Sequence, residues 1–349
     1  MTFIDLRSDT LTQPTPAMRK AMMEAEVGDD GRVGSQGKGE DPTLNKLEAM
    51  AAEILGKERG LFMPSGTMGN LTALMTHCRR GDQVVVGEHA HVLISEKGPF
   101  MPELYSLVPV KVPDPGGKLD LGLLEKALRE KPVRLVCAEN THNFSGGAVI
   151  PLEYLQKIRD VVKAHGLPLH MDGARIFNAA VASGIDAKTI AATADSIQFC
   201  FSKGLSSPVG SMLVGAEKFI LAAREWRKLL GGQMRQAGVL AAAGIESLQH
   251  MIGRLAEDHQ KAKALARALV KEGISIGEEV QTNMVKLDVS ILKLSSKDFQ
   301  SELIKRGVKV HIISPTEVRL VTHKDVSEQD CVAAARIIGQ FWKERLPKS

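Results

Sequence analysis

The amino-acid sequence predicts an α/β protein with a mostly parallel sheet covered by helices on both faces, followed by a small α+β domain. Short β-branched and apolar runs alternate with helical periods from residue 40 to about residue 215, which is the pattern of a parallel sheet. After Gly231 the pattern changes to a long helical stretch and then to shorter elements. The 349 residues suit about two domains. We therefore expect a large domain over residues 1–250 and a small one over residues 251–349.

The expected helices and strands of the large domain follow one another in a regular order. Residues 42–55 carry apolar side chains at helical spacing, and a second helix is expected over residues 71–77. Buried strands are expected over residues 84–86, 133–138, 167–171, 196–200 and 211–214. Such sheets carry their functional residues in the loops after the carboxyl ends of the strands.

The end of the chain has a different pattern. Its helical stretch carries apolar residues at Leu240, Leu248, Ile252, Leu255 and Leu265. Shorter strand-like and helical pieces follow from Ile274 onward. We interpret this region as a small α+β domain joined by a long helix.

Composition and charge exclude several function classes. Lys plus Arg exceeds Asp plus Glu by only four, and no block of five like charges occurs, so we expect no nucleic-acid partner. Aromatic residues make up only 4% of the chain, which disfavours functions that need aromatic platforms. The four cysteines lie far apart without a Cys-x-x-Cys pair, and we expect them to be reduced and mostly buried.

The first residues carry charge by position five and lack the pattern of a secretory signal. No stretch approaches the roughly 18 apolar residues that span a bilayer. We therefore expect a cytoplasmic protein without a membrane partner, acting on a small molecule.

Lys203 directly follows one of the expected buried strands, in a segment rich in Ser and Gly. A partly desolvated lysine at such a place can form a Schiff base with a carbonyl group, although a solvated loop lysine is the ordinary alternative. Asp172 ends another apolar run 31 positions earlier, which suits one helix-plus-strand crossover. Its carboxylate would be able to pair with the ring nitrogen of pyridoxal phosphate, although Asp-Gly alone indicates only a turn.

The segment PSGTMGN places Gly66 and Thr67 at an expected helix start. Free backbone N–H groups there can bind a phosphate, and a plain capped helix is the alternative. His89 and His91 follow the next strand. Either ring would be able to stack on a planar cofactor, but a third metal ligand of convincing spacing is missing, so we expect no metal site. Another polar cluster, ENTHN, contains His142 and follows a further strand.

Together these motifs resemble the L-threonine aldolases, within the pyridoxal-phosphate β-eliminating lyases and aldolases of aspartate aminotransferase-like fold (fold type I). The resemblance covers nearly the whole chain. It rests on several motifs in the order of that family: IDLRSDT, PSGTMGN, ENTHN, HMDGARIFNA, FSKGLSSPVGS, WRKLLGGQMRQAGVLAAAG and VRLVTH.

The resemblance implies a set of residues that bind the cofactor. Lys203 would be the Schiff-base lysine, and Asp172 the partner of the pyridine nitrogen. His91 would stack over the cofactor ring, and Gly66 and Thr67 would hold its phosphate.

The resemblance also implies residues for the substrate and for a second subunit. Ser8, Arg175 and Arg319 would bind the substrate carboxylate, a role that suits a guanidinium fork. His142 would lie beside the substrate hydroxyl and remove its proton, directly or through a water molecule. Arg235 would reach the cofactor phosphate of a neighbouring subunit. The expected assembly is a homotetramer built from dimers, with each active site at a dimer interface.

The reaction that the resemblance implies is retro-aldol cleavage of L-threonine, L-allo-threonine and other β-hydroxy-α-amino acids to glycine and an aldehyde. Elimination or racemisation on the same cofactor is an alternative, because each of these reactions begins in the same way as the aldol cleavage. A binding protein that keeps the fold without the cofactor is a second alternative.

Two segments depart from the family pattern. The loop Gly31–Lys38 is longer than usual and has no aromatic residue, and we expect it to border the pocket and to affect substrate preference. The usual triple glycine is replaced by Gly231, Gly232 and Gln233.

Overall fold

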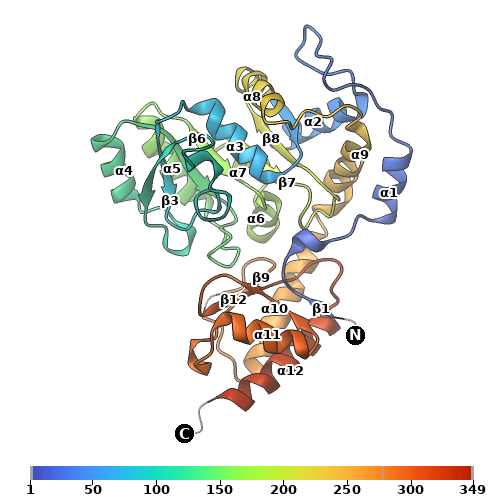
Figure 1. The fold of residues 1–349 in the computed structure, drawn as a ribbon, viewed down its shortest axis with the longest axis vertical. Helices are drawn as coiled ribbons and strands as arrows, with labels where there is room; N and C mark the ends of the chain where they lie inside the picture. Colours follow the sequence, from blue (N-terminus) through green and yellow to red (C-terminus); the bar gives the residue numbers. More distant parts are fainter. Residues whose placement is uncertain (1–2, 278, 347–349) are drawn as a thin grey trace.

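A computed structural model describes residues 3–277 and 279–346. It contains a seven-stranded sheet, which lies in the upper part of the molecule in Figure 1. The strand order is β2-β8-β7-β6-β5-β3-β4. The bounds of these strands are β2 Arg59–Met63, β3 Gln83–Gly87, β4 Val108–Val112, β5 Val133–Glu139, β6 Leu169–Asp172, β7 Ser196–Cys200 and β8 Ser211–Gly215. The five expected strands are all present, the third of them beginning two residues later than expected.

Strand β8 runs antiparallel to its neighbours β2 and β7, whereas the other neighbours pair in parallel. Residues 201–210 alone join β7 to β8. A parallel strand needs a crossover of about a dozen residues or more, usually containing a helix. This connection is too short for that, so the chain turns back.

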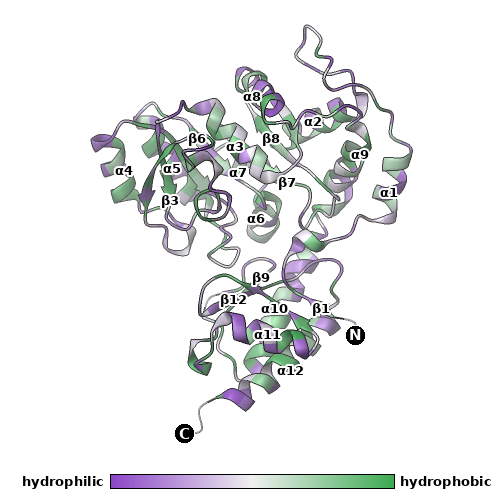
Figure 2. Cartoon of the chain, in the orientation of Figure 1, coloured by the Kyte–Doolittle hydropathy of each residue, from purple (hydrophilic) through white to green (hydrophobic). Residues whose placement is uncertain are grey.

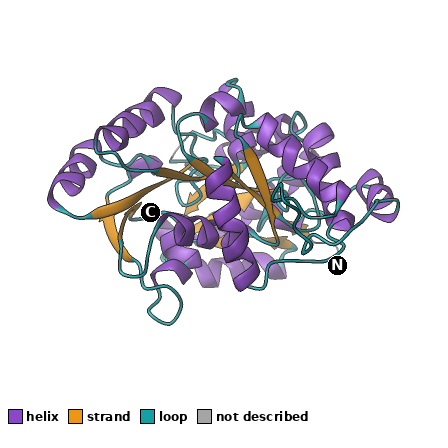
Figure 3. Cartoon of the chain, turned by 90° about the horizontal axis from the view of Figure 1, so that it is seen from above, coloured by secondary structure: helices purple, strands orange, loops and turns teal. Residues whose placement is uncertain are grey.

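Helices cover both faces of the sheet, as expected, and Figure 3 shows the strands between them. Side chains of β3 alternate between two apolar clusters: Val85 enters one, and Val84 and Val86 enter the other. In Figure 2 these central strands are largely green, the colour of hydrophobic residues. The helices of this part are α1 Pro16–Met23, α2 Pro42–Ile54, α3 Gly66–His77, α4 Leu121–Glu130, α5 Leu152–Ala164, α6 Ile176–Ser183, α7 Ala187–Ala191, α8 Glu217–Leu229 and α9 Gly238–Glu246.

The expectation of one long helix after Gly231 is wrong. Helix α9 passes into a π-helical turn over Ser247–Met251, and α10 (Leu255–Lys271) begins after a further turn. The spacing of apolar residues indicates only which face of a helix is buried. A single turn with a different hydrogen-bond pattern leaves that spacing nearly unchanged, so the sequence did not reveal the interruption.

The C-terminal part is a small α+β unit with its own apolar cluster, as expected. It contains β9 (Met284–Asp288), β11 (His311–Ile312) and β12 (Glu317–Val321) in an antiparallel sheet, with α11 (Ser296–Lys305) and α12 (Glu328–Arg345). The first strand of the chain, β1 (Ile4–Asp5), pairs with β10 (Val308–Lys309) of this part, and Leu6 joins its cluster. Strand β1 therefore lies beside the C-terminal part (Figure 1). The expected division at residue 250 stays a prediction.

The four cysteines are buried and free, as expected. Among the described helices, none combines the length and the apolar character needed to cross a membrane.

Candidate active site

Five of the expected site residues line one pocket of about 420 Å³. They are Gly66, Thr67, His91, Asp172 and Lys203. Asp172 ends β6, Lys203 follows the end of β7, and His91 follows the end of β3. Because these strands are parallel, their carboxyl ends meet at one edge of the sheet. The fold therefore brings together residues that are far apart in the sequence.

The start of helix α3 forms one wall of this pocket. Ser65 caps the helix, and its Oγ accepts a hydrogen bond from the N–H of Met68 at 3.2 Å. The N–H groups of Gly66 and Thr67 precede the first intrahelical hydrogen bonds, so they are available to an anion. A Cβ atom at Gly66 would lie 2.8 Å from Cys200 Sγ. Glycine thus lets the helix start lie against β7.

Asp172 is held by two hydrogen bonds. Its Oδ2 accepts from Asn70 Nδ2 at 3.0 Å, and its Oδ1 accepts from the Ala174 N–H at 3.1 Å. Asn70 Nδ2 also donates to Glu96 Oε1 at 3.0 Å, which lies 3.1 Å from His91 Nδ1. The Asp172 carboxylate is therefore oriented by its neighbours before any ligand binds.

Burial alone would lower the pKa of His91. The hydrogen bond to Glu96 and the charges of Asp172 and Glu139 outweigh burial and raise the pKa of His91. Potential metal-ligand atoms of His91, Glu96 and Asp172 lie within 4.8 Å of one another. The same residues line the pocket described above, and the expectation of no metal stays a prediction.

Two arginines from different parts of the chain converge on Asn143. Arg319, on β12, donates from Nη1 to Asn143 Oδ1 at 2.5 Å, and Arg175 Nη1 lies 3.5 Å from the same oxygen. Burial, and then the nearby charge of Arg175, lower the pKa of Arg319 to about 10. Ser8 Oγ accepts from the N–H of Thr10, a residue that lines the pocket. The structure thus brings Arg175 and Arg319 together.

His142 is buried and is not among the residues that line the pocket. Its Nδ1 accepts a hydrogen bond from the Ser145 N–H at 3.2 Å, and its Nε2 lies 3.3 Å from Asp114 Oδ2. Burial opposes protonation, but the carboxylates of Glu139 and Asp114 raise the pKa of His142. His89 Nδ1 lies 2.7 Å from the other oxygen of Asp114. Asp114 therefore lies between two histidines, and the role of His142 stays a prediction.

Arg235 lies outside the pocket. Its side chain is 69% exposed, and its Nη1 donates to both carboxylate oxygens of Asp29 at 3.1 Å. A Cβ atom at Gly31 would lie 2.5 Å from Arg235 Nη1 and 2.7 Å from Gln233 Nε2. The two segments that depart from the family pattern therefore adjoin each other.

The loop Gly31–Lys38 projects at the top of Figure 1 between α1 and α2. None of its residues lines the pocket of the same chain. The expectation that this loop borders the pocket is therefore wrong within a single chain, because Asp29 and Asp30 hold its start against α8 and the segment after it.

Sequence reasoning missed three site residues, Asp9, Asn70 and Glu96, and it placed Asn143 only in the polar cluster ENTHN without a role of its own. Three of these residues lie in motifs named above: Asp9 in IDLRSDT, Asn70 in PSGTMGN and Asn143 in ENTHN. Their contacts with Arg175, Asp172 and Arg319 connect segments that are distant in the sequence. The motifs that contain these residues were the only signal that the sequence offered for them.

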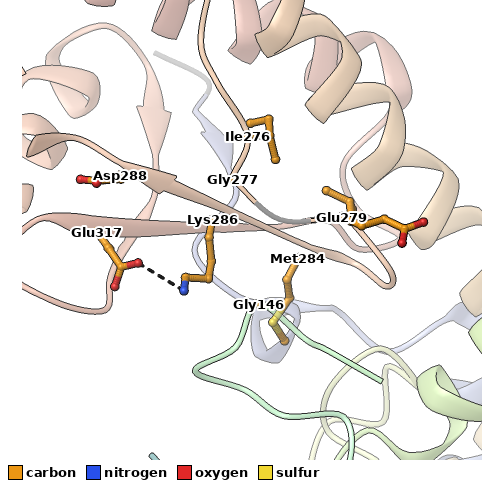
Figure 4. Close-up of a pocket in the computed structure, with 9 residues that line it drawn as sticks. Gly146, Ile276, Gly277, Glu279, Met284, Lys286, Asp288 and Glu317 are labelled. Carbon is orange, nitrogen blue, oxygen red and sulfur yellow. Dashed lines mark ion pairs between the residues drawn. The ribbon is translucent and has the colours of Figure 1, made fainter. Parts of the chain in front are cut away.

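A second pocket, of about 180 Å³, lies between β9, β12 and the loop that carries Gly146 (Figure 4). Lys286 and Glu317 form an ion pair there, with 3.2 Å between Nζ and Oε1. The residues described around it include none of the expected site residues. The pocket at the sheet edge is therefore the candidate active site.

The fold and this pocket define an α/β enzyme with a lysine and a carboxylate at the carboxyl edge of its sheet. The chain belongs to the beta-eliminating lyase family, whose model matches residues 5–291. It is 43% identical over 339 residues to the low specificity L-threonine aldolase of Escherichia coli strain K12, covering 95% of this chain and 97% of that protein. It is 41% identical over 342 residues to low-specificity L-threonine aldolase 1 of Arabidopsis thaliana, covering 95% and 94%.

Among solved structures, the chain is similar to a threonine aldolase of Leishmania major, with a TM-score of 0.81 and 22% identity over 97% of this chain and 99% of that one. The expected fold class and the resemblance to the L-threonine aldolases are confirmed.

Proposed function

We propose that this protein is a pyridoxal-phosphate-dependent aldehyde-lyase that cleaves L-threonine or L-allo-threonine to glycine and acetaldehyde. The observation that carries the proposal is that Lys203, Asp172, His91 and the start of α3 line one pocket. The names of the relatives support the substrate class, and other β-hydroxy-α-amino acids are included in the proposal.

The residues of the pocket fit this cofactor. The N–H groups at the start of α3 suit a phosphate. Glycine is needed at position 66 because Cys200 Sγ already fills the space that a Cβ atom would take there. The Asp172 carboxylate, already fixed by Asn70 and Ala174, suits a protonated ring nitrogen. Lys203 would hold the aldehyde group, and His91 would pack against the ring.

When bound, pyridoxal phosphate supplies a sink for the electrons released as the Cα–Cβ bond breaks. Arg175 and Arg319 would bind the substrate carboxylate together with Ser8. Asp9 already engages Nε and Nη2 of Arg175, so the carboxylate would displace Asn143 from Nη1 of each arginine. Both guanidinium groups would then orient the substrate so that the Cα–Cβ bond is the bond that breaks.

His142, or a water molecule that it positions, would remove the proton from the substrate hydroxyl. Nδ1 of His142 accepts from the Ser145 N–H, and its Nε2 faces Asp114. Because both ring nitrogens face groups of the chain itself, we favour the positioned water as the immediate acceptor.

The proposed assembly is a homotetramer built from dimers. The 69% exposure of the Arg235 side chain, outside its own pocket, supports a role in which this guanidinium reaches the cofactor phosphate of a neighbouring subunit. A cytoplasmic location and the absence of nucleic-acid and membrane partners belong to the same proposal.

Product analysis tests the reaction. Purified protein loaded with pyridoxal phosphate is incubated separately with L-threonine and L-allo-threonine. We expect glycine and acetaldehyde, and the ratio of the two rates measures the stereopreference. Ammonia with 2-oxobutyrate would instead establish elimination, and inverted substrate would establish racemisation. A Lys203→Ala variant with full activity would contradict every cofactor-dependent alternative.

A further inference from the structure

A continuous row of hydrogen bonds runs from Asp172 away from the pocket. Asn70 Nδ2 donates to Asp172 Oδ2 at 3.0 Å, and Asn70 Oδ1 lies 3.1 Å from His170 Nε2. His170 Nδ1 lies 2.9 Å from Ser196 Oγ, which lies 2.8 Å from His77 Nε2. Five polar side chains are thus linked in one row beneath the proposed cofactor site.

Regular secondary structure places these residues in line. His170 and Asp172 are two positions apart on β6, so their side chains lie on the same face of the sheet. Asn70 and His77 are seven positions apart on α3, which is nearly two helical turns, so both face the sheet. Ser196 pairs with His170 in the register of β6 and β7.

The chemistry of the groups sets the direction of each hydrogen bond. Asn70 Nδ2 faces two carboxylates, those of Asp172 and Glu96, each at 3.0 Å. Ionised carboxylates only accept hydrogen bonds, so the amide nitrogen must lie on their side and the amide oxygen on the side of His170. The His170 ring must then carry its proton on Nε2 and donate it to Asn70.

The remaining two hydrogen bonds follow from this assignment. With its proton on Nε2, His170 accepts at Nδ1 from the Ser196 hydroxyl, whose oxygen accepts from His77 Nε2–H. Burial lowers the pKa of His170 to about 3 and that of His77 to about 4, so both rings are neutral near pH 7. Every hydrogen in the row therefore points toward Asp172.

We propose that His170 is a positioning residue for the cofactor: its Nε2–H helps to hold the Asn70 amide so that the N–H of Asn70 points to Asp172 and fixes that carboxylate opposite the ring nitrogen of pyridoxal phosphate. This inference rests on the proposed function. Without the donor at His170 Nε2, the Asn70 oxygen loses its buried partner, and only the contacts with Asp172 and Glu96 still hold the amide in place. The proton on the cofactor ring nitrogen is then held less tightly.

Replacement of His170 by Phe, which keeps a ring but has no donor, tests the proposal. The readout is the ¹⁵N chemical shift of the ring nitrogen in protein loaded with ¹⁵N-labelled pyridoxal phosphate, together with the cofactor dissociation constant. We expect the shift to move toward that of the unprotonated ring and the dissociation constant to rise about tenfold or more. His170→Gln retains an amide donor that can reach Asn70, and it should restore both values in part.

His259→Phe is a matched control, because His259 is also buried and pairs with an asparagine, Asn178, at 3.0 Å. Its loss should leave the ring-nitrogen shift unchanged. An unchanged shift in His170→Phe, or an equal change in both variants, would overturn the proposal.

The unmodified protein supplies a second test that needs no substitution. Long-range ¹H–¹⁵N NMR should find the proton of His170 and of His77 on Nε2 in each case. A His170 proton on Nδ1 would overturn the proposed role alone, whereas protein that takes up no pyridoxal phosphate would overturn the proposed function and this role with it.

Discussion

The carboxylate of Asp9 accepts two hydrogen bonds from Arg175, from Nη2 at 2.7 Å and from Nε at 2.8 Å. Asp9 is completely buried, and Asn283 Nδ2 donates to it as well at 3.1 Å. Burial would raise the pKa of Asp9, but Arg175 holds it well below its ordinary value. This ion pair connects the N-terminal segment to the loop after β6 and so fixes one of the two arginines beside the pocket.

Asp9→Asn should lower the free energy of unfolding at pH 7 by about 3–5 kcal/mol, because Arg175 would remain charged and buried without a counter-charge. Denaturant titration measures the effect. The exposed Asp160 on α5 is the matched control, and Asp160→Asn should change the stability by less than about 0.5 kcal/mol.

The same variant has a defined pH dependence. The folded pKa of Asp9 is lowered, so its stabilisation is present above the ordinary value of 3.8 and is lost as the pH falls toward the folded value. The difference in stability between the natural protein and Asp9→Asn should therefore narrow below about pH 4. A difference that stays constant from pH 7 to pH 3 would show that the Asp9 charge is not the cause.

Gly66→Ala should weaken cofactor binding by about tenfold or more. The new Cβ would lie 2.8 Å from Cys200 Sγ and 3.1 Å from Gln198 Nε2, so the start of α3 must move away from β7. Titration of the cofactor-free protein with pyridoxal phosphate measures the dissociation constant. At Gly253 a Cβ meets nothing within 4 Å, and Gly253→Ala should bind the cofactor normally. Equal affinities in the two variants would refute the role given to the helix start.

Arg319→Lys should raise the KM for threonine roughly tenfold to a hundredfold with a smaller change in kcat, because lysine cannot form the two parallel bonds of a guanidinium fork. The range corresponds to the loss of one hydrogen bond to a charged group, about 1.5–3 kcal/mol. Steady-state kinetics measures both constants. Arg336→Lys, at an exposed position on α12, should leave them unchanged. A normal KM in Arg319→Lys would exclude Arg319 from carboxylate binding.

The half-buried His77 should make the protein less stable in mild acid. Its pKa is lowered from 6.5 to about 4, so between these values the unfolded chain binds a proton that the folded chain does not. Stability is therefore lost as the pH falls from 6.5 to 4, by at most about 1.4 kcal/mol per pH unit for one group. His77→Gln should make this slope shallower, and the exposed His250 serves as the control in His250→Gln. Unfolding titrations from pH 7 to pH 4 measure how steeply the stability changes with pH. An equal slope in His77→Gln and in the unmodified protein would contradict the expectation.

The sequence predicted five of the residues that line the pocket because each of them follows a recognisable strand or starts a helix. Lys203, Asp172 and His91 come after apolar runs that only a buried parallel sheet explains well, and parallel strands end at one edge. The glycine-rich segment at Gly66 marked a helix start for a similar reason. Local pattern and topology placed these residues at one edge of the sheet, and the resemblance of the ordered motifs to one family singled them out as site residues.

Other features depend on which distant segments meet in space. The direction of β8 follows from the short connection over residues 201–210, whereas its apolar run would suit either direction. The contacts of Asp9 with Arg175, and of Asn70 with His170, join segments more than 90 residues apart in the chain.

The sequence by itself therefore determined the fold class, the family and five of the residues that line the pocket. The tertiary structure alone decided which charges are paired, which histidines are neutral, and where His142 and the loop Gly31–Lys38 lie relative to the pocket. Hydropathy and spacing report which side of an element is buried, but a hydrogen bond or an ion pair requires two atoms within about 3 Å, and only the packed chain brings such atoms together.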